Sequence, residues 1–369
     1  MNPQATNRQA KKQQPNSSPP QAKFTLASFV SFIWLLIKHV TKVIWDTTLR
    51  GIKFIEDWLL DSKKALYGIA VTRILLGITA FGLLLTNYRT RLYSFGSGSV
   101  WNGEVLEPKS DFPQIWLFSP FHSAITNDFV YTVLYLLLMG LSVLVVLGWR
   151  TKIVLPVFWV MWVSFIEAND MLGDQGDNMF RIAVLIMFFT DTSARWSFDA
   201  KRRMVTPAKK PSETREQVSN LLHNLGIVAL IAQVSFVYMS GALYKAGGAP
   251  WSEGYAVYNP LQTLRFGTWP VLSDFFTDWG PMVTILSWGS IILQMGFAFM
   301  LLSRPTRVIA LAGILSFHIG IGVLMGLPWF SLSMIAVDSI FIRDRTWKSM
   351  QDRISSLASQ SKNSATLKS

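Results

Sequence analysis

The sequence contains no cysteine and only four histidines among its 369 residues. Without cysteine the chain cannot form a disulfide, a thiolate zinc site or a cysteine nucleophile. The four histidines show neither HExxH spacing nor any other spacing typical of metal ligands. They are His39, His122, His223 and His318. The sequence therefore predicts no metal site.

Charge is also scarce, because only 15% of the residues are charged while 50% are hydrophobic. The mean hydropathy is correspondingly positive, at +0.32. A soluble protein of this length needs more charged side chains to cover its surface. These values favour an integral membrane protein.

Long apolar segments recur along the chain, close to the ~20 residues that a helix needs to cross a membrane. The sequence predicts an all-α polytopic membrane protein with about eight transmembrane helices. It also predicts two ordered extracytoplasmic loops, 88–127 and 245–280, which are rich in aromatic residues, glycine and proline. The predicted spans are 65–87, 128–148, 152–167, 178–191, 222–244, 281–302, 306–325 and 328–342.

The ends of the chain differ from this membrane domain, which we place at 65–342. Residues 1–23 are rich in Gln, Pro, Ser and Asn and lack the apolar core of a signal peptide, which predicts a disordered cytoplasmic arm. In 24–64, apolar residues recur at helical spacing between lysines and arginines, which predicts one or two amphipathic helices on the membrane surface. A ninth span over 24–40 is the alternative. Residues 343–369 are predicted to form a basic cytoplasmic tail.

The net charge of +12 follows the predicted topology. If 1–64 is cytoplasmic and eight spans follow, most of the 34 lysines and arginines fall in the inside segments. This asymmetry is what the positive-inside rule describes, and it predicts that both termini are cytoplasmic. The basic charge therefore indicates orientation and contact with anionic lipid, and not binding to nucleic acid.

Lys245 is the first candidate for a functional residue. It lies in GALYKAGGAPWSEGYAVY (241–258), where the fifth predicted span ends at the outer face and basic residues are rare. A lysine partly removed from water there can act as a base or nucleophile. Paired with Glu253 it would instead stay charged and bind anions. The alternative is an ordinary interfacial anchor, flanked by Trp251 and Tyr255.

The glycines after Lys245 bear on these alternatives. Gly247 and Gly248 are predicted to let the backbone fold back over the end of the helix. Such a turn would bring Glu253, and the aromatic residues beside it, toward the lysine.

A second polar stretch, EANDMLGDQGDNMFRIA (167–183), lies at the outer face in the predicted topology. Asp174, Gln175 and Asp177 supply a compact set of hydrogen-bond acceptors. Arg181 follows Asp177 by four residues, which is the spacing of a structural ion pair on a helix. A purely structural pair and a polar functional site are both consistent with this pattern.

Arg73, Gln294 and His318 are among the polar residues inside predicted spans, where each needs a partner or a function. Arg73 is interpreted as a structural residue that snorkels to the interface or pairs with an acid such as Asp191 or Asp338. Gln294 and His318 are interpreted as helix-packing groups. His318 also lies deep enough in the outer half to share one cavity with Lys245.

Several stretches resemble, in order, the horizontally transferred transmembrane (HTTM) domain, the membrane fold shared with vitamin K-dependent gamma-carboxylases. Within that group the chain is most similar to the sporulation-delaying protein B (SdpB) family. The resemblance extends over about 65–342. It is based on YGIAVTRILLGITAFGLLLTN (67–87), GDQGDN (173–178), FFTDTSARW (188–196), YMSGALYKAGGAPWSEGYAVY (238–258), LSWGSIILQMGFAFML (286–301) and FHIGIGVLMGLPWFSLSMIAVD (317–338).

The SdpB resemblance implies a factor of the bacterial plasma membrane that matures a secreted antimicrobial peptide toxin from its precursor. It also implies a small SdpA-like partner protein. The carboxylase resemblance implies a catalytic base at Lys245 and a reduced quinone as cofactor. A non-catalytic transporter or immunity protein is the third class of function.

The predicted site residues follow from these arguments. The catalytic set is Lys245, His318 and Glu253; the substrate-binding set is Asp174, Gln175, Asp177, Arg181, Trp251 and Tyr255; the structural intramembrane set is Arg73 and Gln294.

Overall fold

A computed structural model describes residues 26–98, 110–169, 172–206 and 211–366. Within these residues the regular structure is entirely helical, which confirms the predicted all-α class. The chain divides into two compact units, Met1–Trp58 and Leu59–Ser369. The predicted disordered arm, 1–23, lies outside the described residues.

The first unit consists of most of α1, Leu26–Leu60, a single helix of 35 residues where one or two were predicted. Large apolar side chains are exposed along it, including Phe32, Trp34 and Trp45. Lysines and arginines interrupt this apolar surface, as the sequence analysis noted. Attachment of α1 to the membrane surface stays a prediction.

Five helices of the second unit are long and apolar enough to cross a membrane. They are α2 (Leu66–Thr86), α6 (Asp128–Leu147), α10 (Glu213–Ala246), α14 (Gly280–Met300) and α15 (Arg304–Leu324). Each matches one of the eight predicted spans. The other three predicted spans are also helical but shorter: α7 (Thr151–Ile166), α8 (Gln175–Met187) and α16 (Pro328–Asp338) with η3 (Ser339–Phe341).

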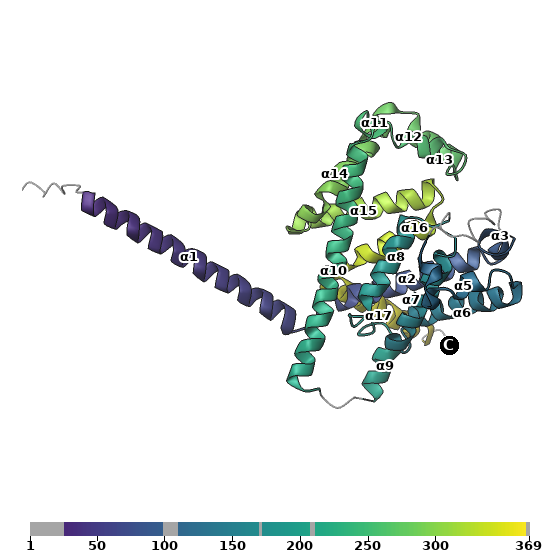
Figure 1. The fold of residues 1–369 in the computed structure, drawn as a ribbon, viewed down its shortest axis with the longest axis horizontal. Helices are drawn as coiled ribbons and strands as arrows, with labels where there is room; N and C mark the ends of the chain where they lie inside the picture. Colours follow the sequence, from purple (N-terminus) through teal and green to yellow (C-terminus); the bar gives the residue numbers. More distant parts are fainter. Residues whose placement is uncertain (1–25, 99–109, 170–171, 207–210, 367–369) are drawn as a thin grey trace, which may run out of the picture. The chain divides into compact units, whose positions relative to one another are not determined.

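Short helices occupy the two predicted loops and the second unit's remaining segments. Beyond the C-terminal end of α10, three of them follow one another (Figure 1). These three are α11 (Ala249–Ser252), α12 (Tyr258–Gln262) and α13 (Pro270–Thr277); the other short helices are α3 (Arg91–Ser94), η1 (Phe112–Gln114), η2 (Trp116–Phe118), α5 (Pro120–Ser123) and α9 (Phe198–Val205). The segment after η3 is a longer helix, α17 (Asp344–Thr366), of 23 residues.

Prolines set where several helices begin. α14, α15 and α16 each have a proline in the first two helical positions, and so do the short helices α5, α11 and α13. Proline suits this position because the first helical N–H groups have no intrahelical partner and its fixed φ is already helical. α7 contains a proline in its interior, Pro156.

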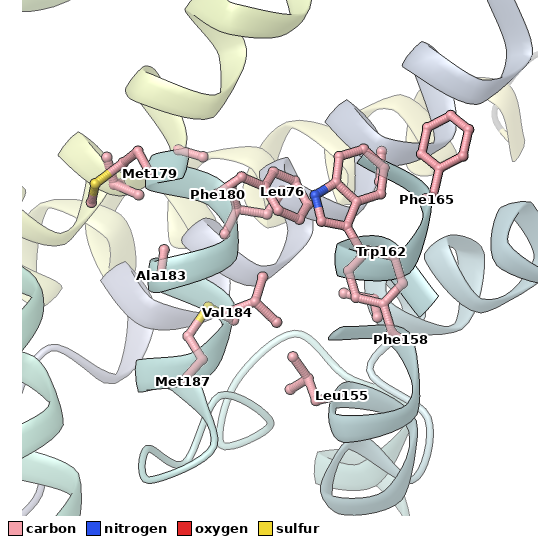
Figure 2. Packing of buried hydrophobic residues seen from close by; sticks show 14 of the residues in the cluster. Leu76, Leu155, Phe158, Trp162, Phe165, Met179, Phe180, Ala183, Val184 and Met187 are labelled. Carbon is pink, nitrogen blue, oxygen red and sulfur yellow. The ribbon is translucent and has the colours of Figure 1, made fainter. Parts of the chain in front are cut away.

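The core of the second unit forms where α2, α7 and α8 meet (Figure 2). Trp162 of α7 stacks on Phe180 of α8 with 4.6 Å between the ring centroids. Leu76 of α2 is buried against the same cluster. α2 also packs against α6 and α16, and α10 packs against α14. The helices α2, α8, α10 and α16 therefore belong to one bundle.

The start of α2 is fixed by polar groups from distant parts of the chain. The carboxylate of Asp344 accepts hydrogen bonds from the backbone N–H groups of Leu66 and Tyr67, at 2.9 and 3.0 Å. The side chains of Asn224 and His223 bind the backbone of Lys64, at 2.9 and 2.7 Å. A carboxylate at a helix N-terminus satisfies free N–H groups and complements the helix dipole.

Gly82 of α2 lies against the ring of Trp329 on α16, and this contact yields a stability prediction. A Cβ at Gly82 would lie 2.1 Å from the ring of Trp329, whose indole N–H donates to Thr86 Oγ1 at 3.2 Å. We expect Gly82→Val to lower stability by about 1–3 kcal/mol, because overpacking forces the helices apart. The measurement is the thermal unfolding midpoint of the purified protein in detergent. Gly289→Ala is the control, since nothing lies within 4 Å of a Cβ there; equal midpoints for both variants would contradict the prediction.

Candidate functional site

Lys245 lies in the last turn of α10, where its side chain is half-buried. Its ammonium group donates to Oε1 of Gln294, on α14, at 2.8 Å. The rings of Trp251 and Phe317 face the same nitrogen, 4.9 and 5.1 Å from their centroids. Among the described residues, no carboxylate forms an ion pair with it. An amide oxygen and two ring faces therefore surround this amine.

The turn after Lys245 differs from the one the sequence predicts. Gly247 and Gly248 have ordinary negative φ values of −80° and −96°. The left-handed residue is Gly254, with φ +83°, where a Cβ would lie 2.9 Å from Thr284. Glu253, just before it, is exposed and does not bind Lys245. The turn brings Trp251 to the lysine and leaves Glu253 at the surface.

Close to Phe317, three buried polar side chains form hydrogen bonds with one another. The hydroxyl of Tyr238 on α10 donates to both carboxylate oxygens of Asp338 on α16, at 2.8 and 2.7 Å. Nε2 of His318 on α15 lies 3.0 Å from the same hydroxyl. All three residues are at most 2% exposed. We call these residues the Tyr238–His318–Asp338 relay.

The hydrogen bonds of the relay assign its protons. Because the Tyr238 hydrogen points to Asp338, the Tyr238 oxygen accepts from Nε2–H of His318. Nδ1 of His318 is then a buried acceptor, and it has no hydrogen-bond partner in the described part of the chain. Asp338 likewise forms no ion pair there. A buried carboxylate without a counter-ion is costly, so this group is a candidate for a proton-handling function.

The sequence analysis singled out His318 but missed Tyr238 and Asp338 as its partners. The ammonium group of Lys245 lies over the ring of Phe317, the residue that precedes His318. The structure thus brings together Lys245, Gln294 and His318. It adds Tyr238 and Asp338 to them, whereas Tyr255 is exposed.

The predicted polar site at the start of α8 is a capping box. Oδ1 of Asp174 accepts from the backbone N–H groups of Gly176 and Asp177, at 2.6 and 3.1 Å. Oδ2 of Asp177 accepts from the N–H of Asp174 at 3.1 Å. This reciprocal pattern satisfies the free N–H groups of a helix start. Gln175, between the two acids, is exposed.

The predicted pair between Asp177 and Arg181 is not formed. Arg181 pairs with Glu167 and donates to Oδ1 of Asn178 at 3.1 Å. Asp177 therefore has no cation within ion-pair distance in the described part of the chain. Burial raises the pKa of the Asp177 carboxyl to about 7, and the neighbouring charges of Asp174 and Glu167 act in the same direction.

Both carboxylates line a cavity of about 140 Å³ between α2, α8 and the start of α16. The cavity is not lined by Lys245, Gln294 or His318. The polar residues of the outer half therefore form two separate groups. The cavity is lined by Thr79, Leu83, Leu172, Asp174, Gly176, Asp177, Gly326, Leu327, Pro328, Trp329, Phe330 and Ser333.

Arg73 is fully buried and binds backbone carbonyl groups, not the acids Asp191 or Asp338. Its guanidinium donates to the carbonyl oxygens of Val145 and Val146 at the end of α6. It also donates to those of Thr192 and Trp196, at 3.1 and 2.8 Å, in the segment after α8. The guanidinium thus joins α2 to two other parts of the bundle, as expected of a structural residue.

The chain matches the family of the HTTM domain over residues 62–347. The chain belongs to the HTTM domain family. It is 25% identical over 283 residues to sporulation-delaying protein SdpB of Bacillus subtilis (strain 168), covering 74% of this chain and 80% of that protein. It is 23% identical over 219 residues to the uncharacterized protein YitO of the same bacterium, covering 55% of this chain and 64% of YitO. No solved structure matches it.

The matched range includes every residue of the candidate site, from Arg73 to Asp338. Membership in this family, together with the five long apolar helices, identifies the chain as a membrane protein. In the described part of the HTTM domain, no group of three His, Cys, Asp or Glu residues could hold a metal ion.

Proposed function

We propose that this HTTM-domain protein matures a secreted antimicrobial peptide toxin at the outer face of the bacterial plasma membrane. Similarity to SdpB, a sporulation-delaying protein, supports a role in producing such a toxin. The small SdpA-like protein and anionic lipid are its proposed partners. A chemical role is supported by the surroundings of Lys245, whose amine has aromatic and amide neighbours and, among the residues that the structure describes, no carboxylate in an ion pair with it.

The proposal includes a topology of eight crossings. Five helices have the length to cross alone, and α7, α8 and α16 with η3 complete the set. A shorter helix can cross with its flanking residues or by local thinning of the bilayer. With the N-terminus inside, the end of α10 and the start of α8 face outward. The precursor would then reach Lys245 from the side to which the mature peptide is released.

In this proposal Lys245 takes a proton from the bound substrate and passes it to the relay. Accepting a proton at Nδ1 of His318 would move the Nε2 proton to Tyr238 and the Tyr238 proton to Asp338. Trp251 positions the amine, and Gln294 orients it through its amide oxygen. Asp174, Gln175, Asp177, Arg181 and Tyr255 are the proposed substrate contacts at the outer rim.

Deletion of the gene in the bacterium that encodes it tests the proposed function. We expect the mature peptide to disappear from the medium while its precursor accumulates, measured by mass spectrometry of both fractions. Re-expression of the wild-type chain should restore the mature peptide. A deletion strain that still secretes the peptide but is killed by it would overturn the proposal in favour of immunity.

A second candidate function is a quinone-dependent modifying enzyme, and the aromatic surroundings of Lys245 favour it. Trp251 and Phe317 could stack on a flat apolar ring, and the Gln294 amide could donate to a ring carbonyl. A reduced quinone would supply electrons and an acidic hydroxyl proton, with Lys245 as the group that would accept that proton. A mass change in the mature peptide that is lost without added quinone would distinguish this function from simple maturation.

The relay yields its own prediction. Asp338→Asn keeps a hydrogen-bond acceptor for Tyr238 but cannot store a proton, so we expect about 100-fold slower maturation with an unfolding midpoint near that of the wild type. The measurement is the rate of peptide maturation as a function of pH. A group that only packs helices would leave the pH profile unchanged, and an unchanged profile in Asp338→Asn would remove the relay from the proposal.

A further inference from the structure

The cavity at the start of α8 combines features that recognise one class of ligand. Its volume of about 140 Å³ exceeds the roughly 30 Å³ share of one water molecule in the liquid. It is nevertheless smaller than the roughly 300–1,000 Å³ of pockets for drug-sized molecules. The cavity therefore suits a single side chain or a headgroup fragment.

The charged wall of this cavity is negative and rigid. Asp174 and Asp177 are fixed by each other's backbone N–H groups. Oδ2 of Asp174 and Oδ1 of Asp177 have no hydrogen-bond partner within the described residues. The nearby cation, Arg181, is occupied by Glu167. Two carboxylates without a counter-ion therefore border one small volume.

A buried hydroxyl in the same cavity also lacks a partner. Ser333 is 4% exposed, lines the cavity, and makes no hydrogen bond with any described residue. Thr79, on the α2 side, donates its hydroxyl proton to the carbonyl of Leu75 at 2.9 Å, so its oxygen can still accept. These groups, with the carboxylates, offer acceptors to a ligand with several N–H donors.

The remaining walls are aromatic and aliphatic. Trp329 and Phe330 line the cavity from α16, and Leu83 and Leu172 line it from the opposite side. Aromatic faces attract organic cations, and aliphatic walls bury a carbon stem. A metal ion is disfavoured here, because only two acidic side chains converge and no third ligand joins them among the described residues.

We propose that this cavity binds a primary ammonium group on an alkyl stem, with Asp174, Asp177 and Ser333 as its acceptors. Three N–H donors and a compact charge match two carboxylates and a hydroxyl. A lysine side chain or amino terminus of a peptide has this chemistry, and so does the headgroup of an ethanolamine lipid. This inference extends the proposed substrate site. It rests on the proposed function only where the ligand is taken to be a peptide.

The turn between α15 and α16 connects this site to the segment after α10. Gly326 has φ +64°, and a Cβ there would lie 2.2 Å from Oγ1 of Thr268. Gly326 also lines the cavity. Through Thr268, the segment after α10 therefore contacts a residue at the edge of the cavity. An ammonium group bound here would tether a substrate at the same end of the bundle as Lys245.

The test uses the purified full-length protein in nanodiscs of phosphatidylcholine and phosphatidylglycerol. Dicyclohexylcarbodiimide labels carboxyl groups that hold a proton, and peptide mass mapping locates the label. We expect labelling of Asp177 that declines as the pH rises through about 7. Butylammonium chloride should lower the labelling at pH 7 at least threefold, whereas butanol or sodium chloride at equal concentration should not.

Variants and lipids sharpen this experiment. Ser333→Ala should keep the label on Asp177 but require several-fold more butylammonium for protection. Asp111→Asn, at an exposed site outside the cavity, should behave like the wild type. Protection in nanodiscs with phosphatidylethanolamine and no added amine would identify the lipid headgroup as the ligand. If neither butylammonium nor phosphatidylethanolamine changed the labelling, the inference would be overturned. Because no peptide is present in this experiment, that result would not bear on the role of Lys245.

Discussion

Lys245→Met is expected to lower peptide maturation by at least about 100-fold, since a missing general base costs about 10²–10⁴ in rate. Methionine has nearly the length of lysine and can still pack between Trp251 and Phe317. The only hydrogen bond lost is the one to Gln294. Expression and membrane insertion should therefore match the wild type. The measurement is the ratio of mature peptide to precursor, normalised to the amount of inserted protein.

Two further variants distinguish a base from an interfacial anchor. Lys245→Arg keeps the positive charge but loses a group that can give up its proton, so maturation should stay low. Gln294→Glu places a carboxylate at the position that now accepts from the lysine, which keeps the amine charged and should have the same effect. Lys152→Met, at an exposed residue early in α7, is the matched control. Full activity of Lys245→Arg would show that Lys245 is an anchor.

The helices could be predicted from the sequence because they depend on local patterns. Apolar runs between prolines such as Pro281 and Pro305 define α14 and α15 within a few residues of the prediction. The bounds of α8 could not be predicted in this way. Its first turn is fixed by the Asp174 capping box, which begins the helix three residues before the predicted span, and the helix ends at Met187, four residues before the predicted end.

The site was only partly predictable, because its contacts join residues that are distant in the sequence. Lys245 was identified from its unusual place at the outer face, but its partner Gln294 is 49 residues away on α14. Tyr238 has the sequence position of an ordinary aromatic anchor near the outer end of an apolar helix. Asp338 is 100 residues further on, and it was considered only as a counter-ion for Arg73. An acid inside a predicted span was the one signal that could have identified the relay.

The same limitation applied to Arg73, because a sequence shows charged partners more readily than backbone ones. Charge pairing suggested Asp191 or Asp338. Asp191 instead pairs with Lys63 at 2.9 Å, and Asp338 binds Tyr238. Two of the carbonyl groups that bind Arg73, those of Val145 and Val146, lie just before Gly148, a residue with φ +64° beside the guanidinium at the end of α6. Helix ends leave such carbonyls without intrahelical partners.

Arg73→Met is accordingly expected to destabilise the protein by about 3–5 kcal/mol, the range for removing one partner of a buried charged interaction. Four backbone carbonyl groups would lose their donor, and methionine offers none in return. The measurement is the unfolding free energy of the purified protein in mixed detergent micelles, followed by tryptophan fluorescence.

Arg73→Lys separates the geometry of the guanidinium from its charge. A single ammonium group has three donors on one nitrogen and cannot span carbonyl groups on both α6 and the 192–196 segment. We therefore expect it to recover less than half of the loss. Arg89→Met, at an exposed arginine after α2, should leave stability unchanged. If Arg73→Met and Arg89→Met had equal unfolding free energies, Arg73 would be a snorkelling residue. The junction of α2, α6 and the segment after α8 would then have to be stabilised by apolar packing alone.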